Sequence, residues 1–141
     1  MRKKFYEETV IVDHLDHTYF ENTIFDKGIF LENDIKDDLV FQNCYIKTVE
    51  AAGPVWIDGN FKIKNCIIED RMNFLLSIRG NLEISNSILL EGLIITDTII
   101  DGDFMIMKSI INKENNINNL FDRKYGYNQI IGTISIVSCC L

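Results

Sequence analysis

The chain has 141 residues, 47% of them apolar, and carries a formal net charge of −7. This length and apolar content suit one folded domain, residues 1–141, with a buried core. The acidic balance argues against direct binding to nucleic acid or to an anionic membrane surface, because both select for basic patches.

Residues 1–17 are expected to form an N-terminal cap, with a short strand at residues 9–12 (Thr-Val-Ile-Val). The basic start is followed by Phe-Tyr-Glu-Glu and not by the apolar core of a signal peptide. No apolar run approaches the roughly 20 residues of a membrane helix. We therefore expect a cytoplasmic protein whose four cysteines are thiols.

The two histidines of the chain, His14 and His17, lie beside carboxylates in this cap. Imidazole and carboxylate both suit zinc, but a metal site needs a third or fourth ligand, and no Cys-x-x-Cys motif supplies one. On an extended strand, a spacing of three residues also sends the two side chains to opposite faces. We interpret both histidines as structural and expect no metal and no other cofactor.

An internal repeat organises residues 18–111. Five segments align without gaps, and their starts are 21, 22, 21 and 22 residues apart. Their third column is apolar, their fifth is asparagine in all rows but the last, and their sixth holds small residues. These three columns are Phe20, Phe41, Ile63, Ile84 and Ile106; Asn22, Asn43, Asn65, Asn86 and Lys108; and Thr23, Cys44, Cys66, Ser87 and Ser109.

The repeat predicts an all-β solenoid. A helical repeat would need a 3.6-residue apolar period, whereas these rows alternate with period two and are rich in Ile, Phe and Asn. A unit of 21 or 22 residues is too short for two packed helices but fits three or four short strands with their corners. Turn residues recur before each new row, at residues 26–28, 37–38, 58–60, 79–81 and 101–103. We expect a parallel β-helix of about five coils stacked about 4.8 Å apart, with asparagines bonding along the stack.

The rows resemble pentapeptide-repeat proteins, in which a large apolar residue recurs every fifth position, two places after a small one. Phe-Glu-Asn-Thr-Ile-Phe at residues 20–25 and Phe-Gln-Asn-Cys-Tyr-Ile at residues 41–46 carry the resemblance. The five-residue rule fails at residues 51–56 and 72–76, and the family winds slightly fewer residues per coil. The resemblance implies a right-handed β-helix. It places Phe25, Ile46, Ile68, Leu89 and Ile111 at the large position.

Residues 112–141 are expected to cover the C-terminal end of the stack. Residues 112–120 are too polar for another coil and indicate a loop or a short helix. Residues 129–137 alternate again, which predicts a last strand that either closes the edge or pairs with a second copy in a homodimer. Capping and dimerisation both stay open at this point.

The cysteines raise the idea of a redox switch, because Cys44 and Cys66 occupy one column of adjacent rows. Since that column holds small residues throughout, we interpret both as small buried hydrophobes. Cys139 and Cys140 lie at the end of the sequence, and nothing marks them as nucleophiles.

No catalytic apparatus is expected. Carbohydrate-active β-helices assemble paired carboxylates in grooves built by long insertions, and this chain has almost none. Asp97 with Asp101, and Glu69 with Asp70, are better interpreted as solvated turn residues. The sequence has no Ser-His-Asp order, Gly-rich phosphate loop or nucleotide fingerprint.

The acidic residues are concentrated in the first half. Residues 5–60 contain 12 acidic residues against three lysines, whereas residues 61–141 contain nine against eight basic residues. We expect the early coils to present a rigid negative strip for the basic surface of another protein. The alternative is an acidic surface that merely keeps the stack soluble. The candidate binding residues are Glu32, Asp34, Asp37, Asp38, Glu50 and Asp58.

The resemblance sharpens this hypothesis, because several pentapeptide-repeat proteins imitate DNA and occupy topoisomerases. It implies a phage-borne or resistance-type inhibitor of a nucleic-acid-handling protein. A structural role, with stacks polymerising end to end as in bactofilin-like β-helices, would require uncapped apolar ends. A carbohydrate-binding β-helix would need an aromatic or acidic groove, and Trp56, Phe74 and Tyr45 are too scattered to outline one.

Overall fold

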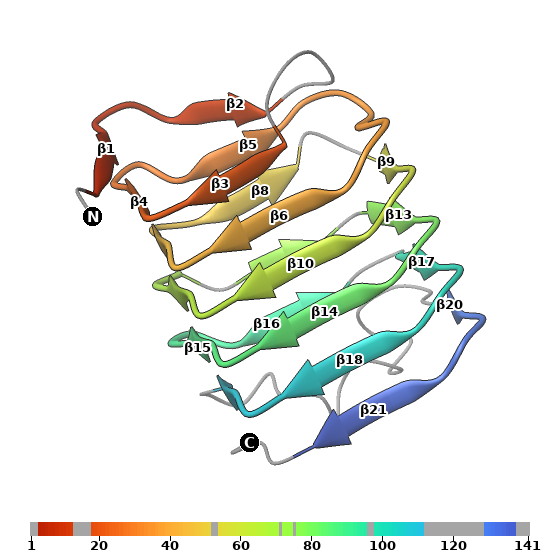
Figure 1. The fold of residues 1–141 in the computed structure, drawn as a ribbon. Helices are drawn as coiled ribbons and strands as arrows, with labels where there is room; N and C mark the ends of the chain where they lie inside the picture. Colours follow the sequence, from red (N-terminus) through yellow and green to blue (C-terminus); the bar gives the residue numbers. More distant parts are fainter. Residues whose placement is uncertain are drawn as a thin grey trace.

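The chain winds into a parallel β-solenoid in which each coil lies on the next (Figure 1). The computed structural model describes residues 3–12, 18–51, 54–70, 72–74, 76–95, 98–111 and 129–137. Over these ranges it contains strands and turns, and no helix long and apolar enough to span a membrane. The predicted all-β parallel β-helix is confirmed.

Each coil crosses four faces in turn, which we number in chain order. The first face contains β3 (Tyr19–Glu21), β6 (Leu39–Gln42), β10 (Phe61–Lys64), β14 (Leu82–Ser85), β18 (Phe104–Met107) and β21 (Ile134–Val137). The second contains β1 (Lys4–Tyr6), β4 (Thr23–Phe25), β7 (Tyr45–Ile46), β11 (Ile67–Ile68), β15 (Ile88–Leu89) and β19 (Ile110–Ile111).

The third face contains β2 (Val10–Val12), β5 (Ile29–Leu31) and β8 (Val49–Ala51), and continues in β12 (Met72–Phe74) and β16 (Leu93–Ile95). The fourth contains β9 (Val55–Ile57), β13 (Leu76–Ile78), β17 (Ile99–Ile100) and β20 (Gln129–Ile130). In the first coil this face is represented by Ile35, which forms an isolated parallel bridge to Ile57.

About four coils are regular, one fewer than predicted; they begin at β3, β6, β10 and β14. Successive rows of the first face are 21 or 22 residues apart, but Phe104 of β18 pairs with Ile134 of β21, 30 residues later. The intervening residues 112–128, predicted to be a loop or short helix, lie outside the described residues. Residues 112–120 are mostly polar in the sequence, so the apolar alternation of the repeat stops after Ile111.

Both terminal strand predictions are confirmed in outline. The strand expected at residues 9–12 is β2, and β1 precedes it on the second face. The single strand expected at residues 129–137 is two strands, β20 and β21, on different faces, because the chain turns a corner at Gly132. His14, His17, Cys139 and Cys140 lie outside the described residues.

The core is made of columns of like residues. Parallel pairing aligns Phe20 with Phe41, Ile63 with Ile84, and Ile84 with Ile106. The rings of Phe20 and Phe41 stack with their centroids 5.2 Å apart, and Ile84 is 0% exposed. Burying a side chain of this size contributes about 1.5–3 kcal/mol, so each column stabilises the whole stack. The large column of the repeat is also buried: Phe25, Ile46, Ile68, Leu89 and Ile111.

The corner between the first and second faces requires a left-handed backbone conformation. Its residue has a φ of 49–55° in every row from Asn22 to Lys108. After glycine, asparagine is among the residues that tolerate this region best, which explains the asparagine column. The predicted bonding along the stack is confirmed where Asn43 donates to Asn22 and where Asn65 Nδ2 donates to Asn43 Oδ1 at 3.4 Å.

The small column next to this corner is a column of hydrogen-bond donors. Ser87 Oγ donates to the carbonyl of Ser85 at 2.8 Å, and Thr23 Oγ1 donates to Glu21 at the same distance. The thiol of Cys66 makes the equivalent contact, with its Sγ 3.1 Å from the Lys64 carbonyl oxygen. The corner therefore selects a residue that is small and also able to donate.

Candidate functional site

The corner between the fourth and first faces holds a second ladder of polar side chains. Asp38 Oδ1 accepts the backbone N–H of Asn60, one coil further on, at 2.7 Å. Asn60 Oδ1 accepts from Asn81, and Asn81 Oδ1 accepts from Asp103, both at 2.8 Å. Asp103 Oδ1 accepts from Thr133 at 2.8 Å. Each coil thus fixes the next through one side-chain oxygen.

Glycines make this close stacking sterically feasible. A Cβ at Gly59 would lie 2.8 Å from the Asp38 nitrogen, and one at Gly80 would lie 2.7 Å from the Gly59 carbonyl oxygen. The backbones are themselves bonded, since Gly80 N–H donates to the Gly59 oxygen at 3.0 Å. The corner is therefore a fixed frame for the side chains that flank it.

Three of the candidate acids, Asp37, Asp38 and Asp58, lie together at this corner in the first two coils; we call them the acidic corner. The contact between Gly59 and the Asp37–Asp38 peptide brings the two coils together there. All three acids are exposed; the charges of Asp37 and Asp38 face solvent, and Asp58 forms an ion pair with Arg79. In the third coil a basic residue, Arg79, takes the position that Asp58 has in the second. Its Nε lies 3.2 Å from Asp58 Oδ1.

Glu32 and Asp34 lie at the neighbouring corner, between the third and fourth faces of the first coil. Asp34 Oδ1 accepts the backbone N–H of Trp56 at 2.9 Å, which repeats the role of Asp38 on the other side of Ile35. Glu32 is exposed beside it. These acids therefore continue the acidic corner around the first coil and not along the stack.

Glu50 is not brought to this group. It lies in the middle of β8 on the third face, opposite Phe30 of β5. Its side chain is exposed. Five of the six candidates thus lie at two adjacent corners of the first two coils, and Glu50 lies on a different face.

The carboxylate pairs considered for catalysis are distributed differently. Glu69 and Asp70 share one cation, Lys47 Nζ, at 3.0 and 3.5 Å, and Tyr45 donates to Glu69. Asp101 is exposed at its corner, and Asp97 lies outside the described residues. Within the described ranges, no group of three His, Cys, Asp or Glu side chains is placed to hold a metal ion.

The aromatic residues considered for carbohydrate binding lie on separate faces. Trp56 is on the fourth face, 38% exposed, with the Arg79 guanidinium 5.1 Å from its ring centroid. Tyr45 is half-buried on the second face. The side chain of Phe74 lies outside the described part of the structure.

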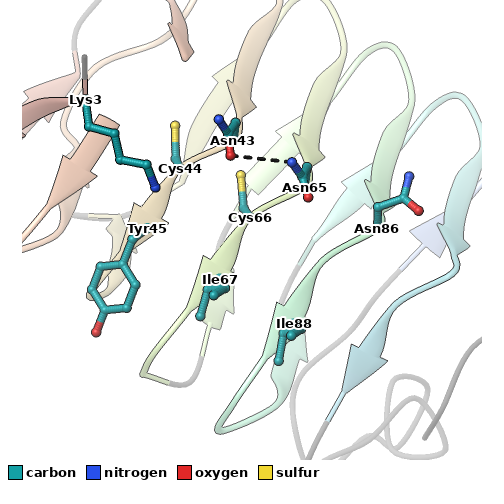
Figure 2. Close-up of a pocket in the computed structure, with 9 residues that line it drawn as sticks. All are labelled: Lys3, Asn43, Cys44, Tyr45, Asn65, Cys66, Ile67, Asn86 and Ile88. Carbon is teal, nitrogen blue, oxygen red and sulfur yellow. Dashed lines mark hydrogen bonds between the residues drawn. The ribbon is translucent and has the colours of Figure 1, made fainter. Parts of the chain in front are cut away.

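A groove of about 230 Å³ runs along the corner between the first and second faces (Figure 2). Cys44 and Cys66 follow one another along it, with Lys3 nearby. A hydrogen bond from the Cys66 thiol lowers the pKa of Cys44, and the same bond together with burial raises the pKa of Cys66. Since both thiols also contact carbonyl groups of the corner, their hydrogen bonds serve the fold.

Sequence reasoning found the acids but missed what holds Asp34 and Asp38. A signal was present for Asp38, because Asp or Asn recurs at the end of each corner, as in Asn60, Asn81 and Asp103. Asp34 has no such periodic counterpart in the sequence. Its role follows only from the bridge that places Ile35 beside Ile57 and so sets Asp34 against Trp56.

No family model matches the chain, and no curated protein or solved structure matches it either. The structure therefore shows a parallel β-solenoid with coils of 21 or 22 residues. Function has to be inferred from the surface of this solenoid.

Proposed function

We propose that the chain is a non-enzymatic, cytoplasmic binding protein whose acidic corner engages a basic surface of another protein. The observation that carries the proposal is the bond of 2.7 Å between Asp38 Oδ1 and the Asn60 N–H. It fixes one exposed carboxylate on the frame that also presents Asp37 and Asp58. A preorganised group loses little conformational freedom when a partner binds, so more of its interaction energy remains as affinity.

The charge distribution supports the same end of the stack. Residues 5–60 hold 12 acidic residues and three lysines, whereas the second half is nearly neutral. A one-sided field of this kind raises the association rate with a cationic partner and makes that rate dependent on salt. We therefore place the partner on the first two coils.

The finer form of the proposal is a divergent pentapeptide-repeat protein that acts as a DNA-mimic inhibitor or decoy of a nucleic-acid-handling protein. Two features support it: the buried small and large columns, and the spacing of about 4.8 Å between stacked coils. The carboxylates of Asp37 and Asp58 would then take the place of backbone phosphates. The same acidic corner serves a simpler binding role if the partner is basic but handles no nucleic acid.

Affinity capture from the native host tests the proposal. We compare the wild-type chain with Asp34→Asn/Asp37→Asn/Asp38→Asn, in which the amide oxygens still accept the Trp56 and Asn60 N–H groups. A charge-matched control is Glu83→Gln/Asp101→Asn/Asp103→Asn in the later half. We expect a basic partner that the wild type and the control retain, that elutes as salt rises, and that the first triple variant loses. An acidic partner, or equal retention by both triple variants, contradicts the proposal.

A further inference from the structure

Within the described part of the chain, the C-terminal end of the first face is an open strand edge. β21 has one neighbour, β18, among the described strands (Figure 1). Its register places Ile134 and Ile136 in the core columns of Phe104 and Ile106. Phe104 and Ile106 are 0% exposed, but Ile134 and Ile136 are 44% and 38% exposed. The core therefore reaches β21, and no further described strand lies over these two side chains.

The backbone of β21 forms hydrogen bonds to β18 along one of its two edges. Phe104 N–H donates to the Thr133 carbonyl and Lys108 N–H donates to the Val137 carbonyl, each at 2.9 Å. Backbone groups alternate in direction along a strand, so Thr133, Ser135 and Val137 face β18. The N–H and C=O groups of Ile134 and Ile136 consequently point away from β18, along the open edge.

The opposite end of the solenoid is different. Phe20 and Val12, which lie in its first layer, are only 6% and 2% exposed. That end also belongs to the acidic half, whereas residues 129–137 carry no charged side chain. If the open, uncharged C-terminal end of one copy stacked on the covered, acidic N-terminal end of another, little apolar surface would be buried. Head-to-tail growth into a filament is therefore disfavoured, and like ends are the better match.

We propose that β21 pairs antiparallel with β21 of a second copy, with Ser135 on the twofold axis. In this register Ile134 of each copy lies opposite Ile136 of the other, and their outward-pointing N–H and C=O groups bond to one another. Ile134 and Ile136 lie on the inward face in both copies, so the two cores become continuous. The contact is isologous and closed, and it removes the strand edge from solvent.

The dimer has a consequence for binding, which rests on the proposed function of the acidic corner. The six-stranded first faces of the two copies join into one sheet. Eleven strand spacings of about 4.8 Å then separate β3 from its symmetry mate, or about 50 Å. The acidic corners lie at the two ends of this rod. It is therefore bivalent for a partner that carries two basic surfaces at that separation.

Disulfide trapping tests the register directly. We place Ser135→Cys in the Cys139→Ser/Cys140→Ser background and oxidise the protein. A self-opposed residue that is not hydrogen-bonded in an antiparallel pair has its Cα atoms about 4.5 Å apart, within disulfide range. We expect a covalent dimer on a non-reducing gel. The matched control is Val137→Cys in the same background, which lies opposite Thr133 of the other copy and should remain largely uncrosslinked. Equal crosslinking of both variants, or of neither, overturns the proposed pairing.

Sedimentation tests the edge without a new cysteine. We expect the wild-type chain to shift from monomer to dimer as its concentration rises. Ile136→Pro removes an N–H that points to the second copy and leaves the bonds to β18 in place, so it should sediment as a folded monomer. A wild type that stays monomeric, a variant that still dimerises, or a species that grows beyond the dimer overturns the proposal. Binding of a basic partner by the monomeric variant is read separately, so failure of the dimer and failure of the acidic corner are distinguishable.

Discussion

The carboxylate of Asp38 and the backbone N–H of Asn60 are joined by a hydrogen bond of 2.7 Å that links the first coil to the second. The same oxygen-to-amide contact recurs between Asn60 and Asn81 one coil later. Asp38 therefore combines two roles: its Oδ1 atom holds the stack together, and its charge faces solvent. A neutral side chain with the same acceptor should separate them.

Asp38→Ala should destabilise the fold, whereas Asp38→Asn should not. Alanine removes the acceptor for the Asn60 N–H, which costs about 1 kcal/mol at an exposed site. Asparagine keeps an oxygen at the same position, as Asn60 and Asn81 do naturally. Urea denaturation of the two variants measures the difference. Equal stability of Asp38→Ala and the wild type would show that the contact contributes nothing.

Ser87→Ala should cost more, because two bonds are lost in a buried place. Ser87 Oγ donates to the Ser85 carbonyl at 2.8 Å and accepts the Cys66 N–H at 3.1 Å. The Ser85 carbonyl keeps the Asn65 N–H as a partner at 2.9 Å, but the buried Cys66 N–H loses its acceptor, which costs about 1–3 kcal/mol. Cys66→Ser is the control, since a hydroxyl keeps the donor to the Lys64 carbonyl. Thermal melts in which Ser87→Ala matches the wild type would refute the role of this column.

Ile84→Asp should unfold the domain. Ile84 is 0% exposed in the middle of an apolar column, so aspartate would bury an unpaired charge at a cost of several kcal/mol. The matched control is Ile67→Asp, which makes the same change at an outward position that is 40% exposed. Circular dichroism should show a cooperative melt for the control only. A wild-type melt of Ile84→Asp would contradict the stacking.

Lys108→Asn should stabilise the protein. Lys108 has a φ of 49°, in the left-handed region where the four preceding rows have asparagine. Relief of this unfavourable conformation by asparagine is expected to contribute about 0.5–1 kcal/mol. The control is Lys62→Asn, which removes the same charge from strand β10. A melting temperature that rises no more for Lys108→Asn than for the control would count against backbone strain at this corner.

The columns of this fold were predictable because a parallel solenoid stacks each residue on its own counterpart. Ile63 and Ile84 align in the sequence, and they pair in the structure. The distribution of acids over the faces was not predictable in the same way. Asp34 and Asp37 are three residues apart, yet they flank different corners because Ile35 turns inward between them.

The end of the stack was equally hard to predict, for a related reason. Nothing in the alternation of residues 129–137 shows that Gly132 turns a corner and divides them between two faces. The donor role of the small column was also hidden, because cysteine and serine suit a small buried site on size alone. Two contacts of the hydroxyl, with the Ser85 carbonyl and with the Cys66 N–H, distinguish Ser87 from an alanine at that place.

The association rate constant with the captured partner, measured across a salt series, tests the acidic corner most directly. For the wild type we expect the rate to fall steeply as salt rises, because the attraction between exposed charges is screened. Asp34→Asn/Asp37→Asn/Asp38→Asn should associate about tenfold more slowly at low salt and depend less on salt, with an unchanged melting temperature. Glu83→Gln/Asp101→Asn/Asp103→Asn should stay close to the wild type. Equal slowing by the two triple variants would show that net charge alone sets the association rate. No slowing by Asp34→Asn/Asp37→Asn/Asp38→Asn would contradict the acidic corner as the binding surface.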